Sequence, residues 1–309
     1  MKHVSVILPT HNPNPLRLER TLTGLAAQTL PVTDWELIVI DNASTSPIKI
    51  PPSLASTLPL RVVREQILGL TAARCRGFAE AIGDICVLVD DDNVLVPGYL
   101  EAARDYLSAH PQVALAGGPV YPEFESTPPR WAEEFYPLLA LRDLGEEPII
   151  KGLTRAPEGT HYQYPLCAPI GAGMVIRTAV ARAWSDVSDR STLTDRKGTS
   201  LTSGGDNDIV LQALQAGHLC GYFPELSLKH LIPTSRLIPS YLVRLNRGIQ
   251  CSWMQVLYHH QANPWPKLSR TSAWLRMAKS WFSYRGWNQP VGKIRWAGAC
   301  GHFEGRIRS

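Results

Sequence analysis

A row of acidic residues directly follows a short apolar segment, and this junction constrains the fold more than any other feature of the chain. Residues 85–89 are all apolar and mostly β-branched, which is typical of a strand buried on both faces of a sheet. The residues that follow are Asp90, Asp91, Asp92 and Asn93. Open α/β sheets bind ligands at the carboxyl ends of their strands, where this cluster is expected to lie.

The acidic cluster has two interpretations. Three adjacent carboxylates repel one another, and hard oxygen ligands suit Mg²⁺ or Mn²⁺, so one interpretation is a metal site for a phosphate-bearing substrate. The other is a solvated turn that caps the next helix, because Asp is common in turns and at helix starts. The cluster alone leaves both interpretations open.

Strand and helix patterns alternate along the first part of the chain. We expect strands at residues 4–8, 35–40, 60–63, 85–89 and 113–116, and helices at 17–28, 71–82 and 97–109. This rhythm predicts a mainly parallel, doubly wound α/β sheet with helices on both faces. Residues 121–165 are rich in Pro and aromatic residues and are expected to form a long loop. After it we expect a strand at 172–176, a Gly-rich loop at 195–205, a helix from Asp206 to Gly217 and irregular helices at 241–309.

The composition indicates one compact body in a reducing compartment. The 309 residues are 44% hydrophobic, which is enough to bury a full core. Six cysteines are scattered without metal-site spacing, so we expect buried free thiols rather than disulfides or a zinc site. The N-terminus has no apolar signal-peptide region, and no segment approaches the roughly 18 apolar residues of a membrane span. We therefore expect a cytoplasmic protein.

Positive charge and tryptophan are concentrated in the C-terminal part. The net charge of the chain is +4, but the residues from Lys229 onward hold thirteen Lys or Arg and one acidic residue, Glu304. Most of the nine Trp residues also lie there. Basic residues beside Trp are typical of proteins on an anionic membrane, and without a nucleic-acid motif we expect no nucleic-acid partner. A solvated basic face with packed Trp side chains is the structural alternative.

Polar side chains also follow the first two predicted strands. Pro9, Thr10, His11 and Asn12 follow the first, and Asp41 ends the second. These groups can bind the base and ribose of a nucleoside at the carboxyl edge of the sheet. The first motif lacks the Gly-rich fingerprint that a dinucleotide-binding dehydrogenase requires.

Residues 204–208 stand at the start of a predicted helix and contain two glycines and two aspartates. Glycine lets the backbone come close to a ligand. Asp206 can therefore belong to a binding site, or it can simply cap the helix, which is the more common role of such a residue.

The order of these motifs resembles family 2 glycosyltransferases of the GT-A fold. The resemblance covers about residues 4–235 and rests on six motifs in order, at residues 9–12, 36–44, 69–77, 90–92, 171–173 and 205–208. It implies a sheet with fused nucleotide-binding and acceptor halves and a helical C-terminal segment. We expect the nucleotide-sugar-binding half at 1–118, the acceptor half with the catalytic base at 119–235, and the basic Trp-rich segment at 236–309.

The resemblance implies a nucleoside-diphosphate sugar as donor, with a UDP-sugar favoured. Asp41 would hold the uracil or ribose of this donor. Pro9, Thr10 and Asn12 would lie near the same nucleoside. Arg74 would lie near the diphosphate.

The resemblance also assigns the residues that carry the chemistry. Asp90 and Asp91 would contact ribose or sugar hydroxyls, and Asp92 would bind the Mn²⁺ or Mg²⁺ that bridges the two phosphates. Asp206 would act as the catalytic base. His230 would join the metal or the diphosphate, as in some members, although a surface histidine near a strand end is an equal alternative.

Sugar transfer requires such groups for physical reasons. A cation stabilises the leaving diphosphate, a carboxylate takes the proton of the acceptor hydroxyl, and both substrates must be held in line. Two separate carboxylate sites favour a single displacement that inverts the anomeric centre. The expected activity is hexosyl transfer to a saccharide or lipid-linked acceptor, in polysaccharide or glycolipid biosynthesis.

Two departures from the family pattern keep an alternative open. Gly205 stands where many members have Glu, and Cys75 stands where Asn is usual. The first departure favours a non-catalytic nucleotide-sugar or glycan-binding protein that retains the fold. An acidic phosphoryl-transfer pocket formed by Asp41 and residues 90–92 is a weaker third hypothesis.

Overall fold

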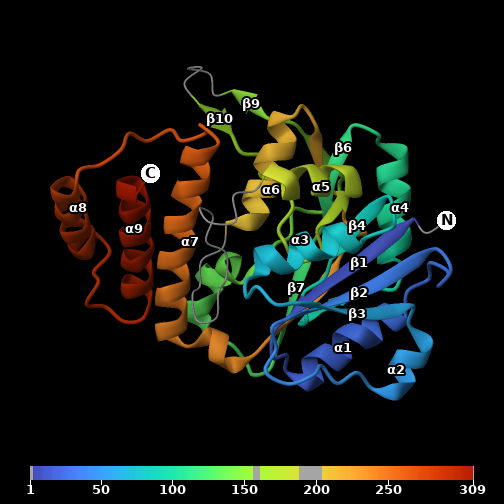
Figure 1. The fold of residues 1–309 in the computed structure, drawn as a ribbon. Helices are drawn as coiled ribbons and strands as arrows, with labels where there is room; N and C mark the ends of the chain where they lie inside the picture. Colours follow the sequence, from blue (N-terminus) through green and yellow to red (C-terminus); the bar gives the residue numbers. More distant parts are fainter. Residues whose placement is uncertain (1–2, 156–160, 188–203, 309) are drawn as a thin grey trace.

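A sheet of eight strands forms the centre of the computed structural model, which describes residues 3–155, 161–187 and 204–308 (Figure 1). Its strands follow the order β3-β2-β1-β4-β11-β6-β12-β8. They are β1 (Val4–Thr10), β2 (Trp35–Asn42), β3 (Leu60–Glu65), β4 (Ile85–Leu88), β6 (Val113–Gly117), β8 (Ile149–Lys151), β11 (Val175–Arg177) and β12 (Leu219–Tyr222).

Parallel pairs make up most of this sheet. β1 pairs in parallel with β2 and β4, β2 with β3, and β6 with β12. β11 runs antiparallel between β4 and β6, and β8 runs antiparallel to β12 at one edge. The predicted mainly parallel α/β sheet is therefore confirmed.

Helices cover both faces of the sheet, and the side chains of the central strands alternate between two cores. In β1, Val6 and Leu8 belong to one core and Ile7 to the other. The first core includes α1 (Pro15–Ala26), α2 (Pro52–Thr57) and α4 (Tyr99–Ala109), and the second includes α3 (Leu70–Glu80), α5 (Thr178–Val187) and α6 (Gly205–Gln215). All six cysteines are buried free thiols, as expected.

A smaller sheet connects the acidic segment to a strand near the end of the α/β region. It contains β5 (Asn93–Leu95), β13 (Leu228–Ile232) and β7 (Val120–Phe124), in that order. His230 is aligned with Asn93, and the backbone N–H of Leu231 donates to the carbonyl oxygen of Asp92 at 2.8 Å. This pairing fixes the place of His230 relative to the carboxylates.

The prediction of a long loop at residues 121–165 is wrong in part. The segment contains most of β7, the 3₁₀ helix η1 (Arg130–Leu139), the edge strand β8, and the short strands β9 (Thr154–Arg155) and β10 (Tyr162–Gln163). Strands of two or three residues are too short to show a period in the sequence, so tertiary pairing decides them. The expected Gly-rich loop at 195–205 lies mostly outside the described residues.

Three helices form a separate layer beside the sheet (Figure 1). They are α7 (Pro239–His259), α8 (Arg270–Ser283) and α9 (Val291–Arg308). Gly298, Gly301 and Gly305 lie along α9 where it meets α7; a Cβ at Gly301 would lie against the backbone of Arg247, so the glycines permit close approach. The predicted helical C-terminal segment is confirmed. Within the described residues, none of the helices combines the length and the apolarity that crossing a membrane would require.

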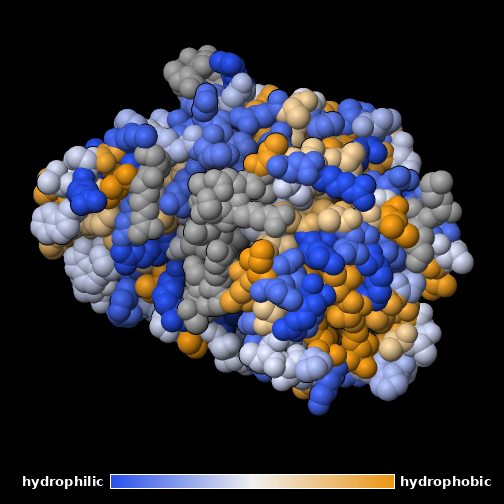
Figure 2. All heavy atoms as spheres, in the orientation of Figure 1, coloured by the Kyte–Doolittle hydropathy of each residue, from blue (hydrophilic) through white to orange (hydrophobic). Residues whose placement is uncertain are grey.

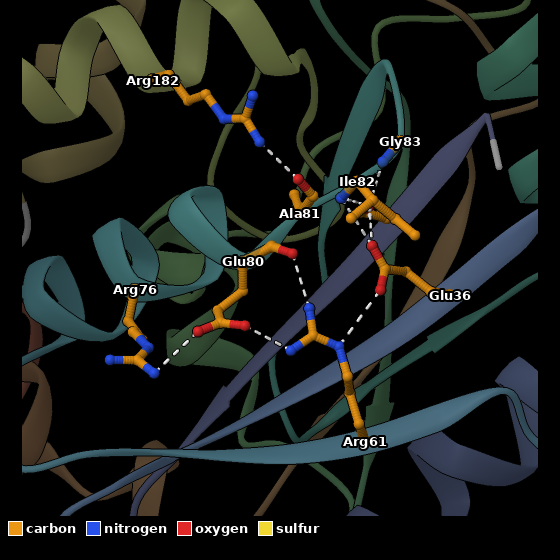
Figure 3. A network of polar contacts seen from close by, with 9 residues as sticks. Glu36, Arg61, Arg76, Glu80, Ala81, Ile82, Gly83 and Arg182 are labelled. Atoms are coloured by element: carbon orange, nitrogen blue, oxygen red, sulfur yellow. Dashed lines mark hydrogen bonds and ion pairs between the residues drawn. The ribbon is translucent and has the colours of Figure 1, made fainter. Parts of the chain in front are cut away.

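A buried carboxylate joins three strands to the end of α3 (Figure 3). Glu36 of β2 accepts hydrogen bonds from the Ser5 hydroxyl at 2.6 Å and from the backbone N–H of Ile82 at 2.9 Å. Arg61 of β3 lies 3.5 Å from Glu36 and pairs with Glu80 at 2.6 Å. Because its partners satisfy it, this charge can stay in the interior and fix where α3 ends.

Candidate active site

A cavity of about 520 Å³ lies at the carboxyl ends of β1 and β4. Tyr241, Leu245 and Ile249 of α7 contribute to its wall. Eight of the ten residues that the sequence predicts for the site line it: Pro9, Thr10, Arg74, Asp90, Asp91, Asp92, Asp206 and His230. Asp92 and Asp206, which are distant in the sequence, therefore share one cavity.

The acidic segment forms a turn between β4 and β5. The backbone N–H of Asn93 donates to the carbonyl oxygen of Asp90 at 3.0 Å, and the Asp92 side chain is buried. The segment does not cap the next helix, because α4 begins at Tyr99 with Gly98 as its N-cap. The helix-cap interpretation of this cluster is therefore wrong.

Asp91 occupies an electrostatically unfavourable position. The hydroxyl of Thr10 donates a hydrogen bond to it, which links β1 to the turn. Burial, followed by the negative charge of Asp92, raises the pKa of Asp91 from 3.8 to about 6, and the Thr10 hydrogen bond opposes this rise. Burial and the neighbouring carboxylate thus disfavour a negative charge on Asp91.

Asp92, His230 and Arg236 form a close cluster. Arg236, which lies in the 3₁₀ helix η2 (Thr234–Leu237), places Nη2 2.9 Å from Asp92 Oδ2 and Nη1 2.8 Å from His230 Nε2. His230 Nε2 is also 3.5 Å from Asp92 Oδ1. Burial lowers the pKa of Arg236 and the charge of Asp92 raises it, with a net upward shift. His230 is buried, so the surface-histidine alternative is wrong.

The donor atoms of Asp92 and His230 fit a divalent cation. His230 Nδ1 lies 2.9 Å from the carbonyl oxygen of Leu139, an acceptor only, so Nδ1 carries the hydrogen and Nε2 presents its lone pair toward Asp92. A metal-binding histidine usually donates the hydrogen of its other ring nitrogen to an acceptor in this way. The 3.5 Å between Nε2 and Oδ1 is close to the separation of two ligands on one ion, each about 2.0–2.2 Å from it.

Asp206 also lines the cavity, from the first turn of α6. It does not cap this helix, because the N-cap is Gly204; instead it forms an ion pair with Arg74 of α3. The backbone N–H of Gly171 donates to Asp206 Oδ2 at 2.9 Å. Each carboxylate oxygen keeps a second lone pair, so Asp206 can still accept a proton. Arg74 is almost fully buried and therefore holds this carboxylate in one orientation.

Behind Asp206, a second carboxylate anchors the same helix. Asp208 is buried and accepts hydrogen bonds from Trp184 Nε1 at 2.5 Å and from His260 Nε2 at 2.7 Å. His259 offers a third ligand atom within 4.8 Å. Since both oxygens of Asp208 already have a donor, hydrogen bonds alone account for this cluster, which ties α6 to the end of α7.

Asp41 and Asn12 do not line the cavity. Asp41 is buried, pairs with Arg64 at 2.5 Å and accepts the backbone N–H of Ser44 at 3.0 Å. Burial favours the neutral acid, but the bonds from Ser44 and Arg64 outweigh it and lower the pKa of Asp41. Asn12 accepts the backbone N–H of Thr45 at 2.9 Å. Both residues shape the loop after β2.

Arg236, Gly171 and His260 were not assigned roles from the sequence. Arg236 stands six positions after His230 in a region rich in Lys and Arg, so its charge there does not indicate a specific partner. Gly171 belongs to the glycine motif at 171–173, and this motif does not indicate a contact with Asp206. His260 carried no local signal, because its partner Asp208 is distant in the sequence.

Comparison with known proteins agrees with the fold and the order of motifs. Residues 5–174 match the family model described as glycosyl transferase family 2. A segment covering 53% of the chain is 31% identical to validoxylamine A glucosyltransferase of Streptomyces hygroscopicus subsp. jinggangensis, of which it covers 40%. Another, covering 33% of the chain, is 32% identical to dolichol-phosphate mannosyltransferase of Pyrococcus furiosus, of which it covers 30%. The chain thus spans less than half the length of these curated relatives.

The whole chain also superposes on a solved structure. The crystal structure of S. aureus TarS 1–349 in complex with UDP matches with a TM-score of 0.53, covering 100% of this chain and 91% of that chain at 16% identity. At this identity the likeness concerns the fold, and it confirms the predicted GT-A architecture. Since the family model covers more than half of the residues, the chain belongs to family 2 of the glycosyltransferases.

Proposed function

We propose that this protein is a metal-dependent, inverting glycosyltransferase that moves a hexose from a nucleoside diphosphate to a hydroxyl of a saccharide or lipid-linked acceptor. The observation that carries the proposal is the shared cavity of Asp92 and Asp206. One carboxylate would belong to a cation site, and the other is held by Arg74 and Gly171. Both groups that the reaction needs are therefore present in one place.

The donor would lie along the carboxyl edge of the sheet. Asp92 and His230 would hold Mn²⁺ or Mg²⁺, and Asp90 and Asp91 would contact ribose or sugar hydroxyls. When bound, the cation would neutralise charge on the leaving diphosphate. The UDP in the TarS crystal structure supports a UDP-sugar as the donor. The nucleoside would lie near Pro9 and Thr10, with Asp41 and Asn12 shaping the adjoining loop.

Asp206 would act as the general base. Its orientation by Arg74 and Gly171 leaves a lone pair for the hydroxyl of the acceptor, which would attack the anomeric carbon from the side opposite the diphosphate. Such a single displacement inverts the anomeric centre. The glucosyltransferase and mannosyltransferase names of the relatives support transfer of a hexose. In this proposal residues 1–118 bind the donor and residues 119–235 bind the acceptor.

The experiment is a nucleotide and transfer screen on the purified protein. UDP with Mn²⁺ should raise the melting temperature more than GDP or dTDP with Mn²⁺, and Asp92→Ala should abolish the rise. UDP-hexoses with candidate acceptors should release UDP. Release of UDP would also exclude the alternative of a non-catalytic binding protein, which the Gly205 departure favours. No metal-dependent shift with any of the three nucleotides would contradict the metal site.

We further propose that the C-terminal layer contacts an anionic membrane surface, where a lipid-linked acceptor would be presented. On α8, Trp274, Leu275 and Phe282 are exposed, and Arg276 and Lys279 are exposed beside them. Figure 2 shows strongly hydrophilic residues next to paler ones along the edge formed by α8, at the left. Aromatic side chains next to cations are suited to the interface of an anionic bilayer.

A further inference from the structure

One guanidinium group contacts both side chains that fit a metal ion. Arg236 contacts Asp92 Oδ2 at 2.9 Å and His230 Nε2 at 2.8 Å. Because His230 Nδ1 donates to the Leu139 carbonyl oxygen, Nε2 is the nitrogen with the lone pair, and Arg236 is its hydrogen-bond donor. The same nitrogen and the same carboxylate are the ligands that fit a divalent cation.

Arg236 and a divalent cation therefore cannot occupy these ligands together. Two positive charges a few ångströms apart repel each other strongly, and the lone pair of His230 can serve only one of them. Binding of a cation requires Arg236 to leave both partners. The backbone need not move, because the guanidinium stands at the end of a flexible side chain that is 21% exposed.

The cavity provides a destination for the displaced group. Arg236 lines the cavity together with Arg74, and the donor diphosphate would bring negative charge into this space. A guanidinium pairs well with phosphate oxygens, which it can contact with two nitrogens at once. An arriving diphosphate thus offers Arg236 a new anionic partner at the moment when a cation takes Asp92.

We propose that Arg236 is an internal counter-cation of the metal site, which yields Asp92 and His230 to the divalent cation and then pairs with the donor diphosphate. This inference rests on the proposed function. It makes the metal and the nucleotide bind cooperatively. The cation alone must displace Arg236 from Asp92 and His230, and the diphosphate alone must draw Arg236 away from them. When both bind, the cation takes Asp92 and His230, and Arg236 pairs with the diphosphate. An Arg236 that only neutralised Asp92 would also weaken metal binding, but its removal would leave unchanged the factor by which UDP tightens Mn²⁺ binding.

The test measures Mn²⁺ binding by the full chain directly, from the electron paramagnetic resonance signal of free Mn²⁺, with and without UDP. Arg236→Gln removes the competing charge, so without UDP it should bind Mn²⁺ about tenfold more tightly than the wild type. The factor by which UDP tightens Mn²⁺ binding should fall about tenfold in the same variant. The matched control is Arg244→Gln on α7, an exposed arginine, which should stay within about twofold of the wild type.

Arg236→Lys provides a second reading if Arg236→Gln folds poorly. A lysine ammonium keeps the charge but cannot contact Asp92 and His230 with two separate nitrogens, so its Mn²⁺ affinity should lie between those of the wild type and Arg236→Gln. An affinity of Arg236→Lys at or below that of the wild type would overturn the inference, as would an Arg236→Gln variant no tighter than Arg244→Gln. If the wild type binds no Mn²⁺ even with UDP, the metal site of the proposed function fails as well.

Discussion

The carboxylate of Asp206 forms an ion pair with the guanidinium of Arg74, 132 positions earlier in the chain. Arg74 is almost fully buried, so it reaches the cavity with little freedom. The backbone N–H of Gly171 holds the second carboxylate oxygen at 2.9 Å. The proposed base is therefore oriented before any substrate arrives, which favours reaction in a fixed geometry.

Replacement of Asp206 by Asn should remove catalysis and retain donor binding. Asn keeps an oxygen that can accept from Arg74, but its amide nitrogen cannot accept the Gly171 N–H and its side chain cannot take a proton. We expect kcat to fall by about 10²–10⁴-fold, the usual contribution of a general base, while the Kd for UDP with Mn²⁺ changes little. The matched control is Asp105→Asn, an exposed carboxylate on α4. Full activity of Asp206→Asn would assign the base elsewhere.

A methyl group at position 171 should displace the proposed base from its orientation. A Cβ at Gly171 would lie against Asp206 Oδ2 and Arg74 Nη2 and would push the pair out of place. Steady-state kinetics should show kcat falling by about 10²-fold, as expected for a misplacement near 1 Å. Gly98→Ala is the matched control, because a Cβ there meets nothing within 4 Å. Unchanged kcat in Gly171→Ala would show that the orientation of Asp206 by Arg74 and Gly171 does not affect catalysis.

Two adjacent histidines should differ sharply in their effect on stability. His260 is buried against Asp208, and its loss leaves one oxygen of a buried carboxylate without its hydrogen-bond donor, so His260→Ala should lower the free energy of unfolding by about 3 kcal/mol. His259 is exposed, and His259→Ala should change it by less than about 0.5 kcal/mol. Urea denaturation measures both. Equal effects would mean that the Asp208–His260 contact adds no stability.

Asp91 should make the folded state less stable as the pH rises. The pKa of Asp91 is raised from 3.8 to about 6, so between these values the folded protein binds more protons than the unfolded chain and stability falls with increasing pH. Asp91→Asn removes this cost, and it should be more stable than the wild type by about 1–2 kcal/mol above pH 6. The difference should vanish below about pH 4. Thermal unfolding across this range measures it, and the exposed Asp84→Asn should follow the wild type.

The exposed face of α8 should bind anionic vesicles. Replacing both Trp274 and Phe282 by Ala removes two side chains that are each 68% exposed, so sedimentation with phosphatidylglycerol vesicles should weaken by about tenfold or more. The control changes Leu16 and Ile82, which are 72% and 64% exposed and lie outside α8. Equal binding by both double variants, or equal binding to neutral vesicles, would contradict a specific membrane face.

Local patterns in the sequence determined the main sheet and half of the site. The apolar run before Asp90 and the alternation of strand and helix patterns predicted a parallel sheet, and carboxyl ends of its strands must lie along one edge. That rule predicts that Pro9, Thr10 and Asp90 lie at this edge, and all three line the cavity. Short-range periodicity and topology suffice for such statements because each depends on a few neighbouring residues.

Only the tertiary structure decided which charges meet. The alignment of His230 with Asn93 in the small sheet brings Arg236 onto Asp92, and the placement of α3 and α6 on the same face of the main sheet brings Arg74 onto Asp206. The register of β2 and β3 aligns Asp41 with Arg64, and Asp41 lies outside the cavity wall. Ion pairs form between residues far apart in the chain, and their partners are selected by strand register and helix packing, which a list of residues does not contain.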